Sequence, residues 1–431
     1  MSDEYTTTVG RPTYWRVIFY QAFIVIYILS CTWLYSLVGM FLSPVLATAI
    51  FIPIVYFLFV SVAEMNLVPL SVFTAISLFF IWQIIQFSRV SGFAPNYTSF
   101  VHLYGPLSFI IAWYFVGTPK IEKILEFLFF ICLAYMFVYC ILVMVSMFTD
   151  IRAFISLDAS YLLLRSDPVR GLRVSFAALP ATYALFYSVM SLARKKRPLD
   201  LAMMLVVVLA IVFAVPRVTA AVLILILAFR AISGSRRILA WVCAGIFFAM
   251  TAFLFTGFLD PAWNPYEAVN FDQTASVRAN SFNLVRVFLV NHPFWGVGYE
   301  GKAQNIYDLT NASWFNMGDL GPVGIYFGFG IIGVLLFSIS VVIACFTNSR
   351  AREEQQKSVG HEALFLTGCF LAAVSFETPT MWDGDGGLFF GIILAQFLKE
   401  KTDSYSERRR LRAKEDAMEF PGAGEANLGA E

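Results

Sequence analysis

Charged residues are scarce in this chain. Asp, Glu, Lys and Arg make up 14% of its 431 residues, while 59% are hydrophobic. A soluble domain carries about 25% charged residues, so this chain has too little polar surface to cover its apolar side chains in water. The uncovered apolar surface must face lipid, and the composition therefore predicts an all-α, polytopic integral membrane protein.

The sequence also lacks a basic domain and a cluster of metal ligands. Its net charge is +1 and its basic residues lie in short, scattered segments, which argues against the basic face that nucleic acid binding requires. None of the six cysteines has a His or Cys at metal-ligand spacing, and DGDGG at 383–387 matches only part of a calcium loop. We therefore predict no cofactor and no metal, and we expect the cysteines to be small buried side chains.

Long apolar runs recur along the whole chain, and about 20 apolar residues suffice for a helix to cross the hydrocarbon core. We predict about twelve transmembrane helices, with a large, partly helical periplasmic loop (259–320) between the ninth and the tenth. These lie in a transmembrane domain (17–399), between a cytoplasmic N-terminus (1–16) without a signal-peptide cleavage site and a disordered cytoplasmic tail (400–431). The predicted spans are 17–39, 43–62, 67–87, 100–117, 124–148, 172–193, 199–215, 218–232, 237–258, 321–345, 361–376 and 387–399.

The connections between these spans carry unequal charge. With a cytoplasmic N-terminus, 21 of the 30 Lys and Arg residues fall on the cytoplasmic side and nine on the other. Cytoplasmic loops carry the excess of basic residues, so both termini are predicted to be cytoplasmic. Eight of the nine outward basic residues are arginines, whose planar and permanently charged fork suits phosphate oxygens.

Two long connections, residues 149–171 and 259–320, lie on the outward side, and loops of this length are usually functional or disordered. In the larger one, Phe282, Val285 and Leu289 recur at helical spacing. We therefore predict an amphipathic helix over 276–291, packed at the outer boundary between membrane and water. Any activity is expected on this side.

Arg217 and Pro216 interrupt a long apolar stretch. Because proline cannot continue helical hydrogen bonding, we predict two short helices that meet at a break there. An arginine near the membrane is costly unless it is paired or lines a wet cavity, and the start of the second helix adds free N–H groups. The pattern indicates a phosphate-sized anion site, with a plain tight turn as the alternative.

Three sequence blocks follow one another between residues 199 and 345. They are Pro216-Arg217-Val218-Thr219; Arg278 leading the amphipathic helix, which ends in His292-Pro293 and Gly296-Val297-Gly298; and Gly321-x-x-Gly324 opening the next span, preceded by Asn311. In order and spacing these blocks resemble the domain shared by bacterial O-antigen ligases and Wzy-type O-antigen or exopolysaccharide polymerases. The ligases carry a histidine before the asparagine, where this chain has Thr310.

The resemblance implies a membrane glycosyltransferase at the periplasmic face of the bacterial inner membrane. Its donor would be an oligosaccharide on undecaprenyl diphosphate, and its protein partners a flippase and a chain-length co-polymerase. Arg217 and Arg278 look like the clamp for the diphosphate, where they would stabilise the charge that grows on the leaving group. No nucleotide is implied, because the lipid diphosphate is already activated.

A general base would assist a hydroxyl acceptor. Glu300, after the glycine turn, and Asp319, before the next span, are the catalytic candidates beside the two arginines, and Glu377 and Asp385 are among the other outward acids. The predicted substrate-binding residues are Arg165, Arg170, Arg286, His292, Trp295, Asn311 and Trp314. His292 stands directly before a proline, which favours a structural role at the helix end, and the tryptophans could equally be interfacial anchors.

The favoured hypothesis is a polysaccharide polymerase that joins lipid-linked repeat units into a longer chain. An O-antigen ligase is the alternative within the same chemistry, and the missing histidine argues against it. A transporter or flippase of an anionic lipid-linked sugar would need charges in the centres of spans, and these spans hold few. The fourth alternative is a scaffold subunit of an export complex, without an active site.

Overall fold

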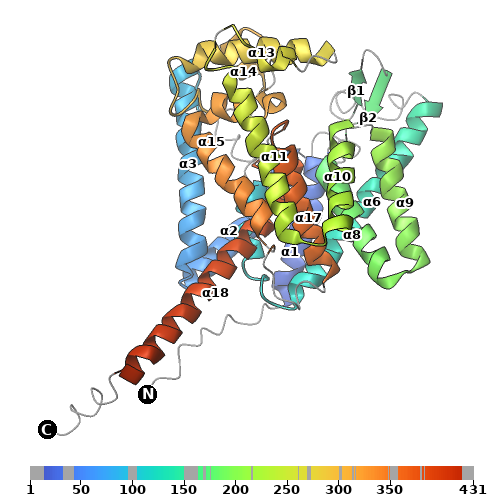
Figure 1. Cartoon of the computed structure of the whole chain (residues 1–431), viewed down its shortest axis with the longest axis vertical. Coiled ribbons are helices and arrows are strands. Elements are labelled where there is room, and N and C mark those ends of the chain that lie inside the picture. Colours follow the sequence, from blue (N-terminus) through green and yellow to red (C-terminus); the bar gives the residue numbers. More distant parts are fainter. Residues whose placement is uncertain are drawn as a thin grey trace, which may run out of the picture.

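A computed structural model shows the chain as a bundle of long helices (Figure 1). The described residues are 14–32, 43–95, 104–149, 164–167, 171–174, 176–214, 217–260, 262–268, 273–299, 303–312, 315, 317–347, 349, 358–378, 381–382 and 384–419. The longer helices are α1 (Tyr14–Cys31), α2 (Ser43–Ala63), α3 (Leu67–Ser91), α6 (Lys120–Phe148), α8 (Ala178–Lys195), α9 (Pro198–Ala214), α10 (Arg217–Ser233), α11 (Arg236–Thr256), α13 (Gln273–Leu289), α15 (Pro322–Phe346), α17 (Val359–Val374) and α18 (Gly387–Glu419). The shorter elements are α4 (Tyr104–Leu107), α5 (Phe109–Ala112), β1 (Leu164–Asp167), β2 (Gly171–Val174), α12 (Pro265–Ala268), α14 (Ala303–Thr310) and the 3-10 helices η5 (Met317–Leu320) and η6 (Gly384–Gly386).

Most of the long helices run between two ends of the bundle (Figure 1). Helix α13 lies across one of them, which we call the α13 end, and the strands β1 and β2 lie at this same end. Helix α18 leaves the bundle at the opposite end. The break between α9 and α10 also lies at the α13 end, so the elements that carry the predicted site share one side of the molecule.

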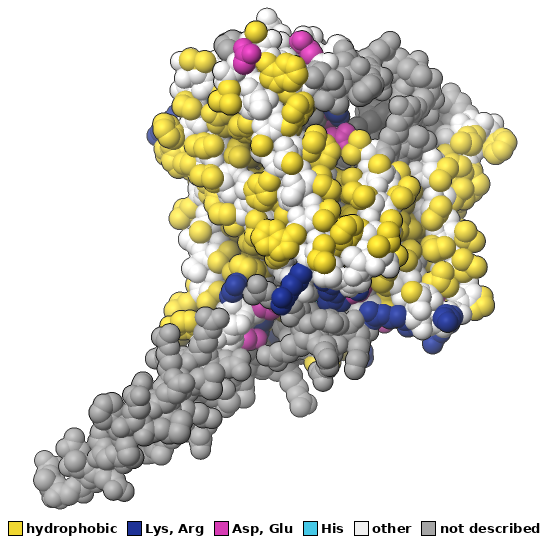
Figure 2. Space-filling view, viewed as in Figure 1, with side chains coloured by type: hydrophobic (Ala, Val, Ile, Leu, Met, Phe, Trp, Pro, Cys, Tyr) yellow, Lys and Arg dark blue, Asp and Glu magenta, His cyan; other side chains and the backbone are white. Residues whose placement is uncertain are grey.

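Apolar helices dominate the bundle. Within the described part of the chain, five are long and apolar enough to cross a membrane, namely α1, α3, α6, α11 and α15, and shorter apolar helices lie at Ala49–Ala63, Pro198–Ala214, Val218–Ser233 and Val359–Val374. Large side chains such as Ile224 and Trp241, each 68% exposed, point away from the bundle, and Figure 2 shows a broad hydrophobic surface between its ends. Such a surface marks contact with lipid. The chain is a multi-pass membrane protein, as its composition predicts.

The fourth predicted span is not one regular helix. In its place the structure has the two four-residue helices α4 and α5. Pro106 has no N–H group to donate, and a β-carbon on Gly105 would lie 2.2 Å from the hydroxyl of Tyr27. This segment is therefore pressed against its neighbours and its helix is interrupted. Each of the other eleven predicted spans overlaps one of the helices, with α15 kinked at Gly330, and the number of membrane crossings stays a prediction.

The sixth predicted span starts too early. Residues 171–174 form β2, which pairs with β1 in an antiparallel hairpin that sets Arg165 opposite Arg173, and α8 begins only at Ala178. Asp167 ends β1 and pairs with Gly171, which begins β2, and both are residue types that favour turns. The first free N–H groups of α8 are satisfied from outside the helix, because Asp385 Oδ2 accepts from Leu179 N at 2.9 Å.

The C-terminal tail is helical over most of its length. Helix α18 continues to Glu419, where the sequence predicts a disordered tail from residue 400. This stretch is rich in Glu, Lys, Arg and Ala, which favour helix, and it extends a helix that is already nucleated inside the bundle. Residues 420–431, like residues 1–13 of the N-terminal segment, lie outside the described residues.

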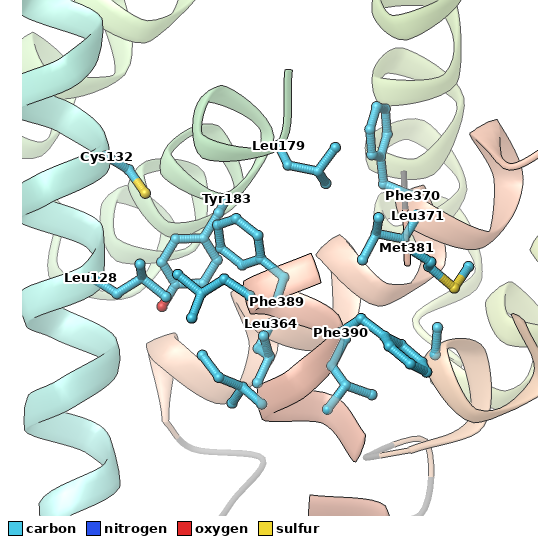
Figure 3. Close-up of a cluster of buried hydrophobic side chains, with 14 of the residues drawn as sticks. Leu128, Cys132, Leu179, Tyr183, Leu364, Phe370, Leu371, Met381, Phe389 and Phe390 are labelled. Atoms are coloured by element: carbon cyan, nitrogen blue, oxygen red, sulfur yellow. The ribbon is translucent and has the colours of Figure 1, made fainter. Parts of the chain in front are cut away.

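The core of the bundle surrounds α17, in which every residue from Gly360 to Val374 is buried. Figure 3 shows part of this core, where Cys132 of α6, Tyr183 of α8 and Phe389 of α18 gather around side chains of α17. All six cysteines are free and five of them are buried. The prediction that they are small buried side chains is confirmed for these five.

A buried carboxylate joins three helices at the end opposite α13. Glu362 of α17 has a side chain that is 1% exposed. It accepts from Arg230 Nε of α10 at 2.9 Å and from the guanidinium of Arg236 of α11. Because burying a lone charge is costly, the carboxylate depends on both partners. The three charges fix these ends of α10, α11 and α17 against one another.

Candidate functional site

The predicted amphipathic helix is present as α13. Its side chains Phe282 and Val285 are fully buried, and Leu289 is 4% exposed. They pack into a small core at the α13 end together with residues of α15, among them Val323 and Phe327. The prediction from helical spacing is confirmed, with bounds of 273–289 in place of 276–291. This packing fixes the side of α13 from which Arg278 projects.

Arg278 forms an ion pair at the α13 end. Its Nη2 lies 3.2 Å from Oε1 of Glu377, which belongs to the turn that follows α17. The side chains are 34% and 25% exposed, so both remain open to solvent. The arginine that the sequence singles out therefore lies beside an acid that is 99 positions away in the chain.

Two glycines bring the backbone segments around this pair together. Gly321 precedes α15 with φ at +54°, and a β-carbon on it would lie 1.9 Å from Phe376 O and 3.2 Å from Glu377 N. A β-carbon on Gly324 would lie 2.0 Å from Met317 O in η5. The Gly-x-x-Gly motif that opens α15 therefore lets α15, η5 and the 375–377 turn meet at one corner, which we call the Arg278 corner. It contains Tyr266, Arg278, η5, Gly321 and Glu377.

Tyr266 lies behind Arg278 in this corner. Its hydroxyl donates to Leu320 O at 2.9 Å, next to Gly321. Burial raises the pKa of the Tyr266 phenol well above its usual value, and the nearby charge of Arg278 partly opposes this shift. Tyr266 therefore stays protonated and serves as a neutral hydrogen-bond donor that fixes α12 against η5.

Replacing Tyr266 with phenylalanine is expected to lower stability by about 1 kcal/mol, because it removes one buried hydrogen bond. The shape of the ring is kept, so the rest of the corner should stay in place. The apparent melting temperature in detergent measures the effect, with Tyr307→Phe on α14 as the comparison. An unchanged melting temperature for Tyr266→Phe would show that the Leu320 carbonyl finds another donor.

The two other predicted residues near the corner have different surroundings. Asp319 is exposed on η5. Arg286 lies two turns beyond Arg278 on α13, where its Nη2 donates to Asp260 O at 3.1 Å and its guanidinium stacks over Phe282. Arg286 therefore ties α13 to the end of α11 and does not join the Arg278 corner.

The Gly-Val-Gly turn after α13 is held to α15 by backbone hydrogen bonds. Helix α15 is not helical at Gly330, where φ is 65° and ψ is −166°. Val297 and Gly298 donate their N–H groups to the carbonyls of Phe327 and Gly328, at 2.8 Å each. The glycines thus permit the close backbone approach that the sequence indicates, and the turn locks α13 onto α15.

His292 and Trp295 lie in the segment between α13 and the Gly-Val-Gly turn. The carbonyl of His292 accepts from Gly296 N at 3.0 Å, in line with a structural role at the end of α13. The indole of Trp295 packs edge-on against Trp82 of α3, with ring centroids 5.5 Å apart. Trp295 is 38% exposed and contacts protein through this edge.

Asn311 ends α14 in the left-handed conformation, with φ at 53°. Asparagine tolerates this backbone region better than most residues, and its side chain is exposed. Thr310, at the position of the family histidine, donates its hydroxyl to Ile306 O at 2.7 Å within the helix. This local hydrogen bond gives Thr310 no role in proton transfer.

The structure describes only some of the remaining predicted site residues. Helix α9 ends at Ala214 and α10 begins at Arg217, so the predicted break is confirmed. Arg165 lies in β1. The start of α10 and strand β1 share the α13 end of the bundle with α13 (Figure 1). Arg170, Glu300 and Trp314 lie outside the described residues.

Glu377 is the site residue that sequence reasoning did not single out. It is one of many outward acids, and the only local signal is its position directly after an apolar span. Asp385 accepts from the first turn of α8 and so caps a helix. Trp382 packs edge-on against Phe79, Phe80 and Phe329.

No group of three or more His, Cys, Asp or Glu side chains that could hold a metal ion occurs among the described residues. The charged groups of the Arg278 corner are one guanidinium, one carboxylate that pairs with it and the exposed Asp319. A part-exposed guanidinium is suited to a phosphate or another anion.

Comparison with known proteins gives no further guide to the site. No protein-family model matches this sequence, and no match was found among curated proteins or among solved structures.

Proposed function

We propose that this protein is a polysaccharide polymerase of the Wzy type. It joins oligosaccharide repeat units that are carried on undecaprenyl diphosphate, at the periplasmic face of the bacterial inner membrane. The observation that carries the proposal is the part-exposed Arg278 on α13, held at the same end of the bundle as the break that precedes Arg217. The order of sequence blocks that resembles the polymerase and ligase family supports it.

The charge distribution supports the proposed orientation. Figure 2 shows Lys and Arg side chains gathered at the end opposite α13. Arg194, Lys195, Arg230 and Arg236 are at helix ends there. Because basic segments stay in the cytoplasm, the α13 end faces the periplasm in this proposal.

The two arginines supply the main electrostatic requirement of such a transfer. When the bond between the sugar and the diphosphate breaks, negative charge grows on the leaving group. Guanidinium groups aimed at these oxygens stabilise that charge through paired hydrogen bonds. In the proposed site, Arg278 approaches from α13 and Arg217 from the start of α10, while the lipid tail stays among apolar helices.

The alternatives have weaker support. The ligase hypothesis lacks its histidine at Thr310, and Thr310 bonds within its own helix. The transporter hypothesis calls for charges along a path through the span centres, whereas the described ion pairs lie at helix ends or in the turn after α17. Neither gains a specific observation in its favour.

The test is polymer length in a deletion strain complemented at matched protein level. Arg217→Ala and Arg278→Ala are each expected to leave single repeat units where the wild type makes long chains. Arg89→Ala is the matched control, because Arg89 is an α3 arginine at the α13 end that stacks on Trp82. It should make polymer of normal length.

Two other outcomes would redirect the assignment. Normal polymer in both arginine variants would reject the catalytic proposal and leave transport or scaffolding as the better account. In the deletion strain itself, long chains that build up on the carrier lipid without reaching lipid A would identify a ligase.

A further inference from the structure

Glu377 is positioned by backbone contacts as well as by its ion pair. Its N–H donates to Val374 O at 2.9 Å, which continues the last turn of α17. Gly321 packs against the other side of this turn, where a β-carbon on it would lie 1.9 Å from Phe376 O. The carboxylate therefore extends from a fixed turn, on which α15 and α17 converge, toward Arg278.

Among the described residues, Arg278 is the one side chain that pairs with this carboxylate, which is 25% exposed. The neighbouring acids differ from it. Asp385 accepts from Leu179 N at the start of α8, and Asp260 accepts from Ala262 N at 2.9 Å in its own turn. Asp319 is exposed on η5. Among the acids that the structure describes, Glu377 is thus the one that an anion held by Arg278 would meet.

We propose that Glu377 accepts the proton of the attacking sugar hydroxyl, and that Arg278 holds its carboxylate in the empty site. This inference rests on the proposed function. An entering diphosphate competes with the carboxylate for the guanidinium, since both are anions that bind the same fork of N–H groups. The competition frees the carboxylate beside the phosphate, which is where the acceptor hydroxyl must approach.

The transfer then balances without a further reactant. The acceptor oxygen forms a bond to the anomeric carbon while the bond from that carbon to the phosphate oxygen breaks. The electron pair of the broken bond stays on the diphosphate, where Arg278 stabilises it. The hydroxyl proton passes to a carboxylate oxygen of Glu377, and from there to water once the product leaves.

The experiment separates proton transfer from donor binding. Purified Glu377→Gln protein in detergent is compared with the wild type for binding of undecaprenyl diphosphate, and for polymer formation from lipid-linked repeat units extracted from the deletion strain. Loss of a general base is expected to lower the rate by about a hundredfold or more, while undecaprenyl diphosphate binds as tightly or more tightly. Arg278→Ala is expected to weaken binding of the same probe.

Two more variants test whether the loss of rate in Glu377→Gln is purely structural. Glu377→Asp keeps a carboxylate and should retain part of the activity, with a rate that falls at acid pH, whereas the residual rate of Glu377→Gln should not fall in this way. Glu267→Gln changes an exposed acid on α12 and should behave as wild type. Weak binding of undecaprenyl diphosphate to Glu377→Gln would overturn the proposal, because Glu377 would then serve only to position Arg278.

The same set of variants distinguishes the role of Glu377 from the proposed polymerase function on which it rests. Full polymer formation by Glu377→Gln together with an inactive Arg278→Ala rejects the proton acceptor and leaves the polymerase standing. Full polymer formation by Arg278→Ala and by Arg217→Ala rejects the polymerase, and the role of Glu377 with it.

Discussion

Replacing Gly321 with alanine is expected to disrupt the Arg278 corner and to abolish polymer formation. The new β-carbon would stand 1.9 Å from Phe376 O, and the neighbour it meets is backbone that cannot rotate away. Its φ of +54° adds backbone strain of about 1–3 kcal/mol, and overpacking adds about 1–3 kcal/mol more. The turn that carries Glu377 must move, and its distance from Arg278 must change.

The measurements for Gly321→Ala are the apparent melting temperature in detergent and polymer length in the complemented strain. Gly245→Ala is the matched control. It lies inside α11, where a β-carbon would meet no atom within 4 Å, and alanine is favoured over glycine in a helix by about 0.5–1 kcal/mol. A Gly321→Ala protein as stable and active as the control would show that the corner tolerates a shift of the 375–377 turn.

Replacing Glu362 with alanine is expected to cause the largest loss of stability at the other end of the bundle. The change leaves Arg236, which is 6% exposed, without the carboxylate that it shares with Arg230. Removing one partner of a buried ion pair typically costs about 3–5 kcal/mol, because the other charge stays buried without compensation. A much lower yield of folded protein and a lower apparent melting temperature in detergent are the expected results.

Glu64→Ala is the control for this second prediction. Glu64 pairs with Arg16 at 3.1 Å, but its side chain is 32% exposed. Exposed ion pairs contribute about 0–1 kcal/mol, so Glu64→Ala should change stability little. Equal effects of the two substitutions would mean that water or another group reaches Arg236 once Glu362 is gone.

Several features of the protein follow from the sequence through local rules. The long apolar runs determine the membrane class, because a span needs only length and apolarity. The period of Phe282, Val285 and Leu289 predicts α13 and the side that it buries, since neighbours along one helix decide this pattern. Pro216 predicts the break before Arg217, because a proline in a helix interior removes a backbone hydrogen bond and often kinks or breaks the helix.

Local rules also mislead where the tertiary structure intervenes. Apolar composition predicts one helix over 100–117, yet the structure has the short helices α4 and α5 there, packed closely against Tyr27 at Gly105. High charge predicts disorder after residue 400, yet the helix nucleated in the bundle continues to Glu419. In both places the neighbouring helix or the preceding turn, rather than the composition of the segment, determines the backbone conformation.

The sequence by itself determined that this protein crosses the membrane several times, that an amphipathic helix carries Arg278 and that glycines precede α15. Only the tertiary structure decided which acid lies against that arginine. Glu377 is 99 positions from Arg278, and no periodicity or spacing links two residues on separate elements. Their contact depends on how α15 passes between α13 and the end of α17, which is a property of packing and has no local signal.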